Sequence, residues 1–193
     1  MNTIVPKTLF NEDIIKDYLK YNIKVLENDY VTYDDLHQHD IVNIYIPYTN
    51  INNFFFETFG SFVYKHSTTI LIDSILSKEK NSDSTSVFAH MNHTSFDLIV
   101  IHKGKLVLSN SYSYETNEDF LYYVMFTAEQ LRLNPEEFTL IFLGEISKTD
   151  SCYTLAHQYI RTIRFGNNTN SKKTSQSIPP IDSHQHFVLL SHF

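Results

Sequence analysis

The sequence has one cysteine, no long apolar run and no leader-like start. Cys152 has no partner for an internal disulfide, which is typical of a protein in a reducing compartment. No stretch approaches 18 uninterrupted apolar residues, so we expect no membrane span. The first 20 residues contain no basic segment followed by an apolar run, so we expect no secretory signal peptide. These absences together predict a cytoplasmic protein.

Basic residues are also scarce. The chain has 15 Lys and Arg against 22 Asp and Glu, a net charge of −7. Because nucleic-acid binding depends on neutralised phosphates, this balance opposes a nucleic-acid partner. The only basic cluster, Lys172 and Lys173, lies in a polar tract.

Hydrophobic and aromatic residues, by contrast, are plentiful. Hydrophobic residues make up 42% of the 193 and charged residues 19%, which predicts a globular protein with a sizeable core. Fifteen Phe and thirteen Tyr beside four Gly and no Trp indicate strands and buried aromatic rings. The length allows one large domain or two small lobes.

The first part of the chain alternates between helical and extended patterns. We expect a helix capped by Asn11, an apolar strand ended by Pro47 and a short helix stopped by Gly60. The full series is helix 11–22, strand 40–48, helix 50–60, strand 61–67 and helix 68–78. The aromatic run of the 50–60 helix is most simply lobe core, with a partner groove as the alternative. The polar stretch 79–86 predicts a boundary between lobes.

The second part predicts three antiparallel strands followed by alternating helices and strands. Lys103 and Gly104 form a tight hairpin turn, and Thr116 with Asp119 resembles a capping box before an apolar, buried helix closed by Asn134 and Pro135. The expected elements are strands 86–91, 95–102 and 105–114, the helix from 116, strand 138–146, helix 151–161, strand 162–166, a flexible polar loop 167–180 and a last strand 184–193.

This order, three antiparallel strands and then helix, strand, helix, strand, is that of a ribonuclease-H-like unit with a mixed sheet and flanking helices. The region before Ser84 reads as the later part of a second such unit without its opening hairpins. Two such units form the α/β actin-like ATPase fold. We therefore predict a first, N-terminally incomplete actin-like half over 1–79 and a second, ribonuclease-H-like half over 84–193.

Several segments carry a family resemblance. "TIVPKTLF", "DYLKYN", "VNIYIPYTNINNFFFETFG", "YKHS", "NEDFLYYVMFTAEQLRLNPEE" and "LGEI" occur in order over nearly the whole chain. They resemble the domain of unknown function 3822 family, which is bacterial and mainly from Bacteroidetes. The resemblance implies an actin-like ATPase fold similar to PilM-type proteins, and no established activity. Family members usually begin with further strands, so by this resemblance the chain is short at its N-terminus.

A nucleotide site in this fold would use two strand–turn–strand loops with glycines, a hydroxyl and an Asp that organises Mg²⁺. The second loop falls on "AHMNHTS". Thr94 and Ser95 supply hydroxyls, whereas Ala89 or His90 stands at the Asp position and Met91, Asn92 and His93 stand at the glycine positions. The loop on the adenosine side usually has two glycines, and "LGEI" keeps Gly144 and continues with Glu145. The pattern favours a loop in the position of a phosphate loop that lacks the Asp and the glycines needed to bind phosphate and Mg²⁺. If a nucleotide site survives, its candidate residues are Asn92, Thr94, Ser95, Gly144 and Glu145.

Other chemistries have weaker support. A ribonuclease-H-type nuclease needs converging carboxylates, and the first strand of this unit has no Asp. The histidines of "HQHD", "HMNH" and "HQH" suggest metal ligands, but no single cluster supplies three. Cys152 opens a helix without a clearly placed base. No Gly-x-Ser-x-Gly motif supports a serine hydrolase.

We therefore predict a non-catalytic, actin-like scaffold or adaptor that acts through protein contacts and needs no cofactor. An incomplete first sheet exposes an unpaired edge, which favours a homo-oligomer or a protein partner. The alternatives are an ATPase of the same fold that binds ATP and Mg²⁺ through divergent loops, and a metal-dependent hydrolase built on His90 and His93.

Overall fold

The computed structural model describes residues 2–21, 23–26, 28–167 and 183–191. The chain divides into two compact units, Met1–Asp73 and Ser74–Phe193, and the division falls inside one helix, α3 (Ser67–Glu79). The polar loop expected over 167–180 lies, beyond Asn167, outside the described residues. Within the described ranges no helix is long and apolar enough to cross a lipid bilayer.

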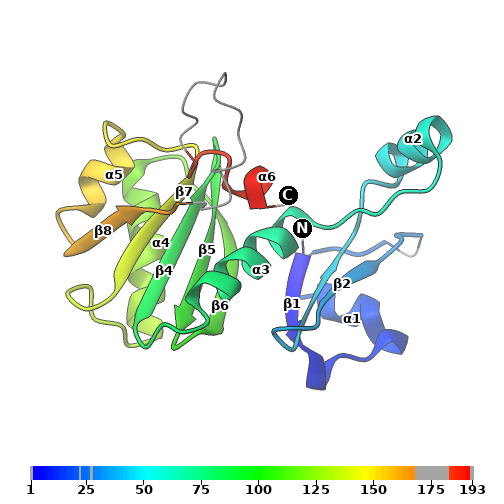
Figure 1. The fold of residues 1–193 in the computed structure, drawn as a ribbon, viewed down its shortest axis with the longest axis horizontal. Helices are drawn as coiled ribbons and strands as arrows, with labels where there is room; N and C mark the ends of the chain where they lie inside the picture. The colour runs from blue at the N-terminus through cyan, green and yellow to red at the C-terminus, as the bar shows by residue number, and fades with distance from the viewer. Residues whose placement is uncertain (1, 22, 27, 168–182, 192–193) are drawn as a thin grey trace. The chain divides into compact units, whose positions relative to one another are not determined.

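The first unit contains a three-stranded antiparallel sheet with the order β1-β3-β2 (Figure 1). Every residue of the central strand is buried. One face packs Val42 and Ile44 against Val5 and Leu19. The elements are β1 (Asn2–Pro6), the 3-10 turns η1 (Lys7–Leu9) and η2 (Glu12–Ile14), α1 (Ile15–Leu19), β2 (Thr32–Leu36), β3 (Ile41–Tyr45), α2 (Thr49–Phe59) and the first part of α3.

A polar network joins β2 and β3 to the start of α3. The Asn43 side chain, fully buried, donates to Thr69 Oγ1 at 2.8 Å. The carboxylate of Asp34 accepts from the Tyr45 hydroxyl at 3.0 Å, from Thr69 Oγ1 at 2.6 Å and from the His66 backbone N–H at 2.8 Å. Burial and the nearby Asp34 charge raise the pKa of Tyr45, so this hydroxyl remains a hydrogen-bond donor.

The second unit is a five-stranded mixed sheet with the order β6-β5-β4-β7-β8. β4, β5 and β6 are antiparallel neighbours, whereas β7 runs parallel to β4 and β8 runs parallel to β7. The elements are β4 (Thr85–Met91), β5 (Ser95–His102), β6 (Lys105–Ser113), α4 (Asn117–Gln130), β7 (Thr139–Gly144), α5 (Ser151–Ala156), β8 (Thr162–Phe165) and α6 (Phe187–Ser191). This is the strand order expected for the ribonuclease-H-like unit.

Local chemistry explains these elements. Lys103 and Gly104 both have positive φ, 49° and 71°, as a two-residue hairpin turn requires. Thr116 and Asp119 form the predicted capping box at the start of α4. Apolar residues on one face of the sheet, including Phe96 and Phe142, pack with α4 and α5. On the other side of the sheet, Lys78 Nζ of α3 lies 4.3 Å from the centre of the buried Phe187 ring of α6.

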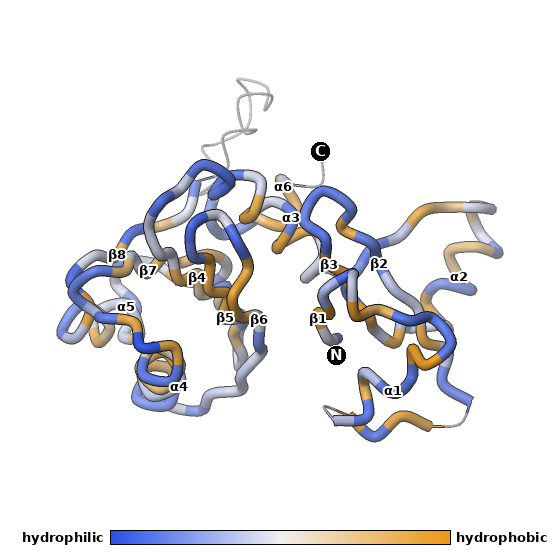
Figure 2. The backbone as a smooth tube through the Cα atoms, turned by 90° about the horizontal axis from the view of Figure 1, so that it is seen from below, coloured by the Kyte–Doolittle hydropathy of each residue, from blue (hydrophilic) through white to orange (hydrophobic). Residues whose placement is uncertain are grey.

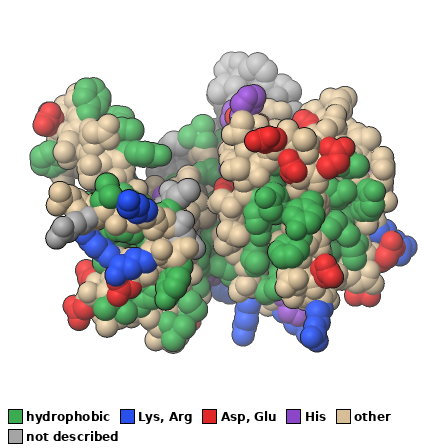
Figure 3. Space-filling model, turned by 180° about the vertical axis from the view of Figure 1, so that it is seen from behind, with side chains coloured by type: hydrophobic (Ala, Val, Ile, Leu, Met, Phe, Trp, Pro, Cys, Tyr) green, Lys and Arg blue, Asp and Glu red, His purple; other side chains and the backbone are tan. Residues whose placement is uncertain are grey.

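Three expectations about the elements are wrong, and two strands were missed. Residues 61–67 form no strand before α3, and the expected last strand is replaced by α6, because Phe187 packs into the core beside Lys78. Strands β1 and β2 were not predicted. Finally, α4 is not buried all round. It covers only one face of the sheet, so Tyr122 and Phe126 are 60% and 43% exposed on its outer side, where Figure 3 shows hydrophobic side chains gathered over the larger unit.

Candidate functional site

The sheet register brings the predicted nucleotide residues to one edge of the second unit. Met91, the last residue of β4, pairs with Gly144, the last residue of β7. The turn that follows Met91 closes through a 2.8 Å hydrogen bond from the Asn92 N–H to the Ser95 carbonyl. The Thr94 carbonyl accepts from the Tyr114 N–H at 3.2 Å. The turn 92–95 and Gly144–Glu145 therefore meet at Met91.

Gly144 is required at this edge by the backbone alone. Its φ is +79°, and a Cβ at this position would lie 2.2 Å from the Met91 carbonyl oxygen. A side chain there would break the junction between β4 and β7 whether or not a ligand binds. The backbone geometry alone therefore explains why a glycine stands at position 144, without any need for a ligand.

The backbone N–H groups of Gly144, Glu145 and Ile146 at this edge bond the protein itself. The Gly144 N–H donates to the His184 carbonyl at 2.7 Å, and the Glu145 N–H donates to the Met91 carbonyl at 2.8 Å. The Ile146 N–H donates to the Gly144 carbonyl at 2.9 Å. These three groups lie on the adenosine side of the predicted site. In the phosphate turn the Asn92 N–H is likewise used, by the Ser95 carbonyl, whereas a phosphate-binding turn needs its N–H groups free to face the anion.

The position at which this fold would use a magnesium-binding Asp carries no carboxylate. Ala89, at the position where the fold would use Asp, is fully buried in the core. His90 instead faces Asp97, with 3.4 Å between Nδ1 and Oδ2, and Asp97 also accepts from the Ser111 hydroxyl. Because the serine proton bonds the aspartate rather than the histidine, this cross-strand set lacks the geometry that activates a serine. The residues at this edge do not fit a magnesium nucleotide well.

The histidine clusters have other contacts. His37 Nδ1 lies 3.0 Å from Asp35 Oδ2, and His39 Nε2 lies 3.2 Å from Asp73 Oδ1. His184 Nε2 lies 2.8 Å from the Ile146 carbonyl oxygen. Among residues 2–21, 23–26, 28–167 and 183–191, no group of three or more His, Cys, Asp or Glu side chains is arranged to hold a metal ion.

Cys152 is buried at the start of α5, and its thiol donates to Asn117 Oδ1 at 3.1 Å. Burial, with smaller contributions from Asp150 and Glu118, raises the pKa of the thiol to about 11. It is therefore a neutral thiol at physiological pH and a poor nucleophile.

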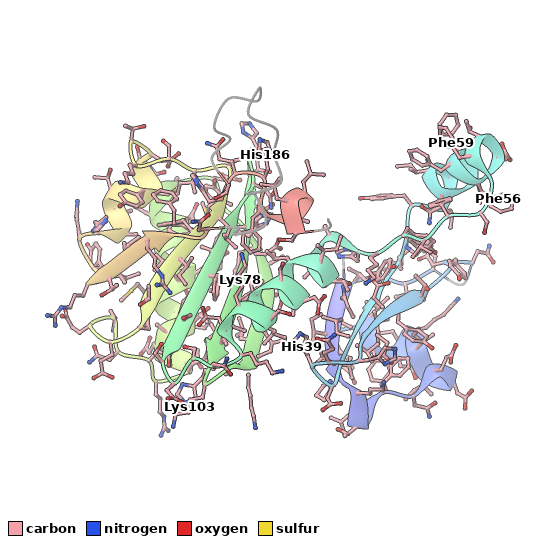
Figure 4. The ribbon with its side chains drawn as sticks, in the orientation of Figure 1. His39, Phe56, Phe59, Lys78, Lys103 and His186 are labelled. Atoms are coloured by element: carbon pink, nitrogen blue, oxygen red, sulfur yellow. The ribbon has the colours of Figure 1, made fainter. Side chains whose placement is uncertain are left out.

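A different site emerges in the first unit, on α2. This helix has no buried residue. Figure 2 shows hydrophobic residues along its backbone, and Figure 4 shows Phe56 and Phe59 on it. Phe55 contacts Phe54, Phe59 and Phe62, with ring centres 5.8, 5.9 and 6.0 Å apart. We define the aromatic surface by its exposed members: Tyr48, Ile51, Phe54, Phe55, Phe56, Phe59, Phe62, Val63 and Tyr64. The sequence indicated this run, but lobe core was its simplest interpretation.

Beside this surface is a cavity of about 390 Å³, lined by residues that include Tyr30, Asn52, Phe56, Phe62 and Tyr64. Sequence reasoning did not find Tyr30 or Tyr64 as site residues, because they lie far apart in the chain and no motif links them. The cavity has apolar walls with two asparagines, Asn52 and Asn53, at its side. Such a lining suits an apolar side chain with a nearby peptide group.

The chain was also compared with known proteins. A family model described as "Protein of unknown function (DUF3822)" matches residues 1–163. A search of curated proteins found no match. One similar crystal structure is a protein from Bacteroides thetaiotaomicron VPI-5482 with an actin-like ATPase fold and unknown function. The TM-score is 0.80 and the identity 22%, over 98% of this chain and 69% of that chain.

A second similar structure is the PilM-PilN type IV pilus biogenesis complex. Here the TM-score is 0.66 and the identity 10%, over 98% of this chain and 73% of that chain. These likenesses confirm the predicted actin-like ATPase fold.

Proposed function

Since the chain belongs to the DUF3822 family, as the resemblance predicted, and has an actin-like ATPase fold, we propose that it is a non-catalytic scaffold or adaptor that acts through protein contacts. The observation that carries this proposal is the aromatic surface of α2. Monomeric proteins rarely expose an apolar patch larger than a few hundred Å² without using it. α2 exposes Phe56 and Phe59 at 59% and 71%, and no residue of this helix is buried.

A protein of similar fold also supports a role in protein contacts. The PilM-PilN structure is, by its name, a complex between proteins. A protein partner for this chain is therefore in keeping with its fold neighbours. The net charge of −7 and the lone cysteine are consistent with a protein partner in the cytosol.

The nucleotide edge supports the non-catalytic part of the proposal. The N–H groups of Gly144 and Glu145 bond His184 and Met91, and the Asp position of the turn is taken by Ala89 or by His90, which faces Asp97. Catalysis of phosphoryl transfer depends on backbone donors and a held magnesium ion. We accordingly propose that the chain works without ATP or Mg²⁺.

A second candidate is an ATPase with divergent loops, favoured by one observation. The β4–β7 register places the turn 92–95 beside Gly144 and Glu145, as a nucleotide site in this fold would require. In that case Asn92, Thr94 and Ser95 would lie near phosphate, and Gly144 with Glu145 near the adenosine.

Isothermal titration calorimetry with MgATP separates these two functions. We expect no saturable heat from the full chain. Saturable binding that Thr94→Ala weakens and Thr162→Ala leaves unchanged would refute the non-catalytic proposal and establish the second candidate. Thr162 is a suitable control because it is exposed at the start of β8, at the opposite end of the sheet from Gly144.

A separate experiment tests whether the chain acts through protein contacts. The paired variant Phe56→Ser with Phe59→Ser removes two exposed rings of α2, and Tyr122→Ser with Phe126→Ser removes two exposed rings of α4. We expect chemical cross-linking in cells to yield defined adducts of the wild type and of the α4 variant, and fewer with the α2 variant. Equal adducts from all three proteins would show that the aromatic surface of α2 binds nothing.

A further inference from the structure

The segment Ser61–Lys65, between α2 and α3, has the side-chain period of a β-strand but belongs to no sheet. Phe62 and Tyr64 both line the cavity beside α2, and their rings lie 5.9 Å apart. Val63, between them, is 90% exposed. Phe62 and Tyr64 therefore share one side and Val63 faces the other, as in a strand, while Ser61 at the start of the segment also lines the cavity.

The backbone of this segment is unpaired. Within the described parts of the chain, the N–H and C=O groups of Ser61 through Lys65 form no hydrogen bond with other backbone groups, whereas Gly60 bonds Phe56 and His66 bonds Asp34 on either side. Aromatic and β-branched residues favour sheets. A free strand-like edge of this kind is a template for pairing with another chain.

The exposed area beside the segment is as large as an interface. The aromatic surface keeps between 38% and 90% of each side chain in solvent. At 150–250 Å² for a whole aromatic side chain, this amounts to roughly 900 Å² of apolar surface. One side of a standard protein interface buries about 800 Å². Because consecutive helical residues such as Phe54, Phe55 and Phe56 point to different sides of α2, one partner covers only part of the exposed area, and the pairing of Ser61–Lys65 adds the rest of the contact.

We propose that the occupant of this surface is a second copy of the chain, paired through Ser61–Lys65 in antiparallel register about a two-fold axis at Val63. This inference rests on the proposed protein-contact function and names its partner. In this register Val63 lies opposite Val63 of the other copy, and Phe62 lies opposite Tyr64, so that the rings form cross-strand aromatic pairs. The two α2 helices then cover the same face of the new ribbon.

Charge is compatible with self-pairing. From Pro47 to Tyr64 the sequence has one charged residue, Glu57. Across the two-fold axis Lys65 meets Ser61 rather than another lysine, so no like charges are opposed. A neutral surface fits a second neutral surface better than it fits a strongly charged partner.

Disulfide trapping tests the register directly. Cβ atoms of directly opposite residues lie about 4.5–5.5 Å apart in an antiparallel pair, near the separation that a disulfide spans. We expect the full-length Val63→Cys variant to form a covalent dimer under mild oxidation. The matched control is Val107→Cys, an exposed valine on the edge strand β6, which should remain monomeric on a non-reducing gel. The native Cys152 is buried and should not contribute.

Analytical ultracentrifugation measures the oligomeric state without cross-linking. We expect the wild type to be a dimer at micromolar concentration and the double variant Phe56→Ser with Phe59→Ser to be a monomer. A wild type that stays monomeric overturns the inference. The inference is also overturned if the wild type is a dimer but Val63→Cys forms no covalent dimer, or if Val107→Cys forms the covalent dimer instead. A monomer without MgATP binding leaves the scaffold proposal intact, whereas saturable MgATP binding refutes the non-catalytic proposal whatever the oligomeric state.

Discussion

Replacing Gly144 with alanine separates a structural glycine from a ligand-binding one. The residue has a φ of +79°, and an added Cβ would lie 2.2 Å from the Met91 carbonyl oxygen and 3.0 Å from its nitrogen. If the glycine serves the β4–β7 junction, the alanine variant loses stability in the absence of any ligand. If it serves a nucleotide, the loss appears mainly in binding.

The expected magnitude has two parts. Positive φ costs a residue with a Cβ about 1–2 kcal/mol, and forcing an atom into a filled site costs about 1–3 kcal/mol more. Gly104 supplies the control in the same unit, since its φ is +71° and its Cβ would lie 2.9 Å from the Lys80 carbonyl oxygen. We expect Gly144→Ala to lower the free energy of unfolding by about 2 kcal/mol more than Gly104→Ala does.

Urea unfolding followed by circular dichroism gives the two free energies, and amide hydrogen exchange assigns the loss to a part of the chain. Exchange should accelerate in β4 and β7 of the Gly144→Ala variant. Equal destabilisation by the two substitutions would refute the steric argument, because their φ angles are nearly the same and the added Cβ clashes more severely at Gly144, 2.2 Å from the Met91 carbonyl oxygen, than at Gly104, 2.9 Å from the Lys80 carbonyl oxygen.

Three further predictions concern the second unit. Phe187→Ala should lower the free energy of unfolding by about 3–5 kcal/mol, since it empties a buried site beneath Lys78; a change near zero in urea unfolding would show that α6 is not anchored by this ring. Thr116→Ala should cost about 1 kcal/mol by removing the N-cap of α4, whereas Thr154→Ala at the exposed side of α5 should cost less; similar losses for both would contradict the capping geometry. Folding raises the pKa of the Cys152 thiol from 9.0 to about 11, so the stability that the neutral thiol contributes is complete below pH 9 and declines as pH rises toward 11. The melting temperatures of the wild type and of Cys152→Ser should therefore converge between pH 9 and 11. Melting temperatures that stay a constant distance apart over this range would refute the burial of the thiol.

The second unit could be predicted closely from sequence because its signals are local. The alternation of β6, the Lys103-Gly104 turn and the Thr116 cap each depend on residues adjacent in the chain. The expected strand order followed from the sequence of elements, because short connections and crossover rules leave few topologies.

The remaining errors have tertiary causes. Residues 61–67 have a strand pattern, yet a strand needs a partner, and among the described residues the sheet of the first unit ends at β1 and β2. The segment 187–191 is helical because Phe187 enters the core beside Lys78, 109 positions earlier in the chain (187 − 78). At the candidate site, the sequence showed the missing Asp and glycines, but not that His184 uses the Gly144 N–H.

The position of the unit boundary inside α3 has a practical consequence for dissecting the protein. Thr69 of this helix completes the hydrogen bonds of Asn43 and Asp34 in the first unit, while Ile75 and Leu76 are buried and Glu79 accepts from the Ser86 hydroxyl in the second. A cut between Thr69 and Ile75 leaves each half its own contacts but divides the helix into two short pieces, which are too short to be stable as helices by themselves. Separately expressed fragments should overlap, each with its own complete copy of 67–79, and a limited-proteolysis cut within α3 should unfold both products rather than release one intact.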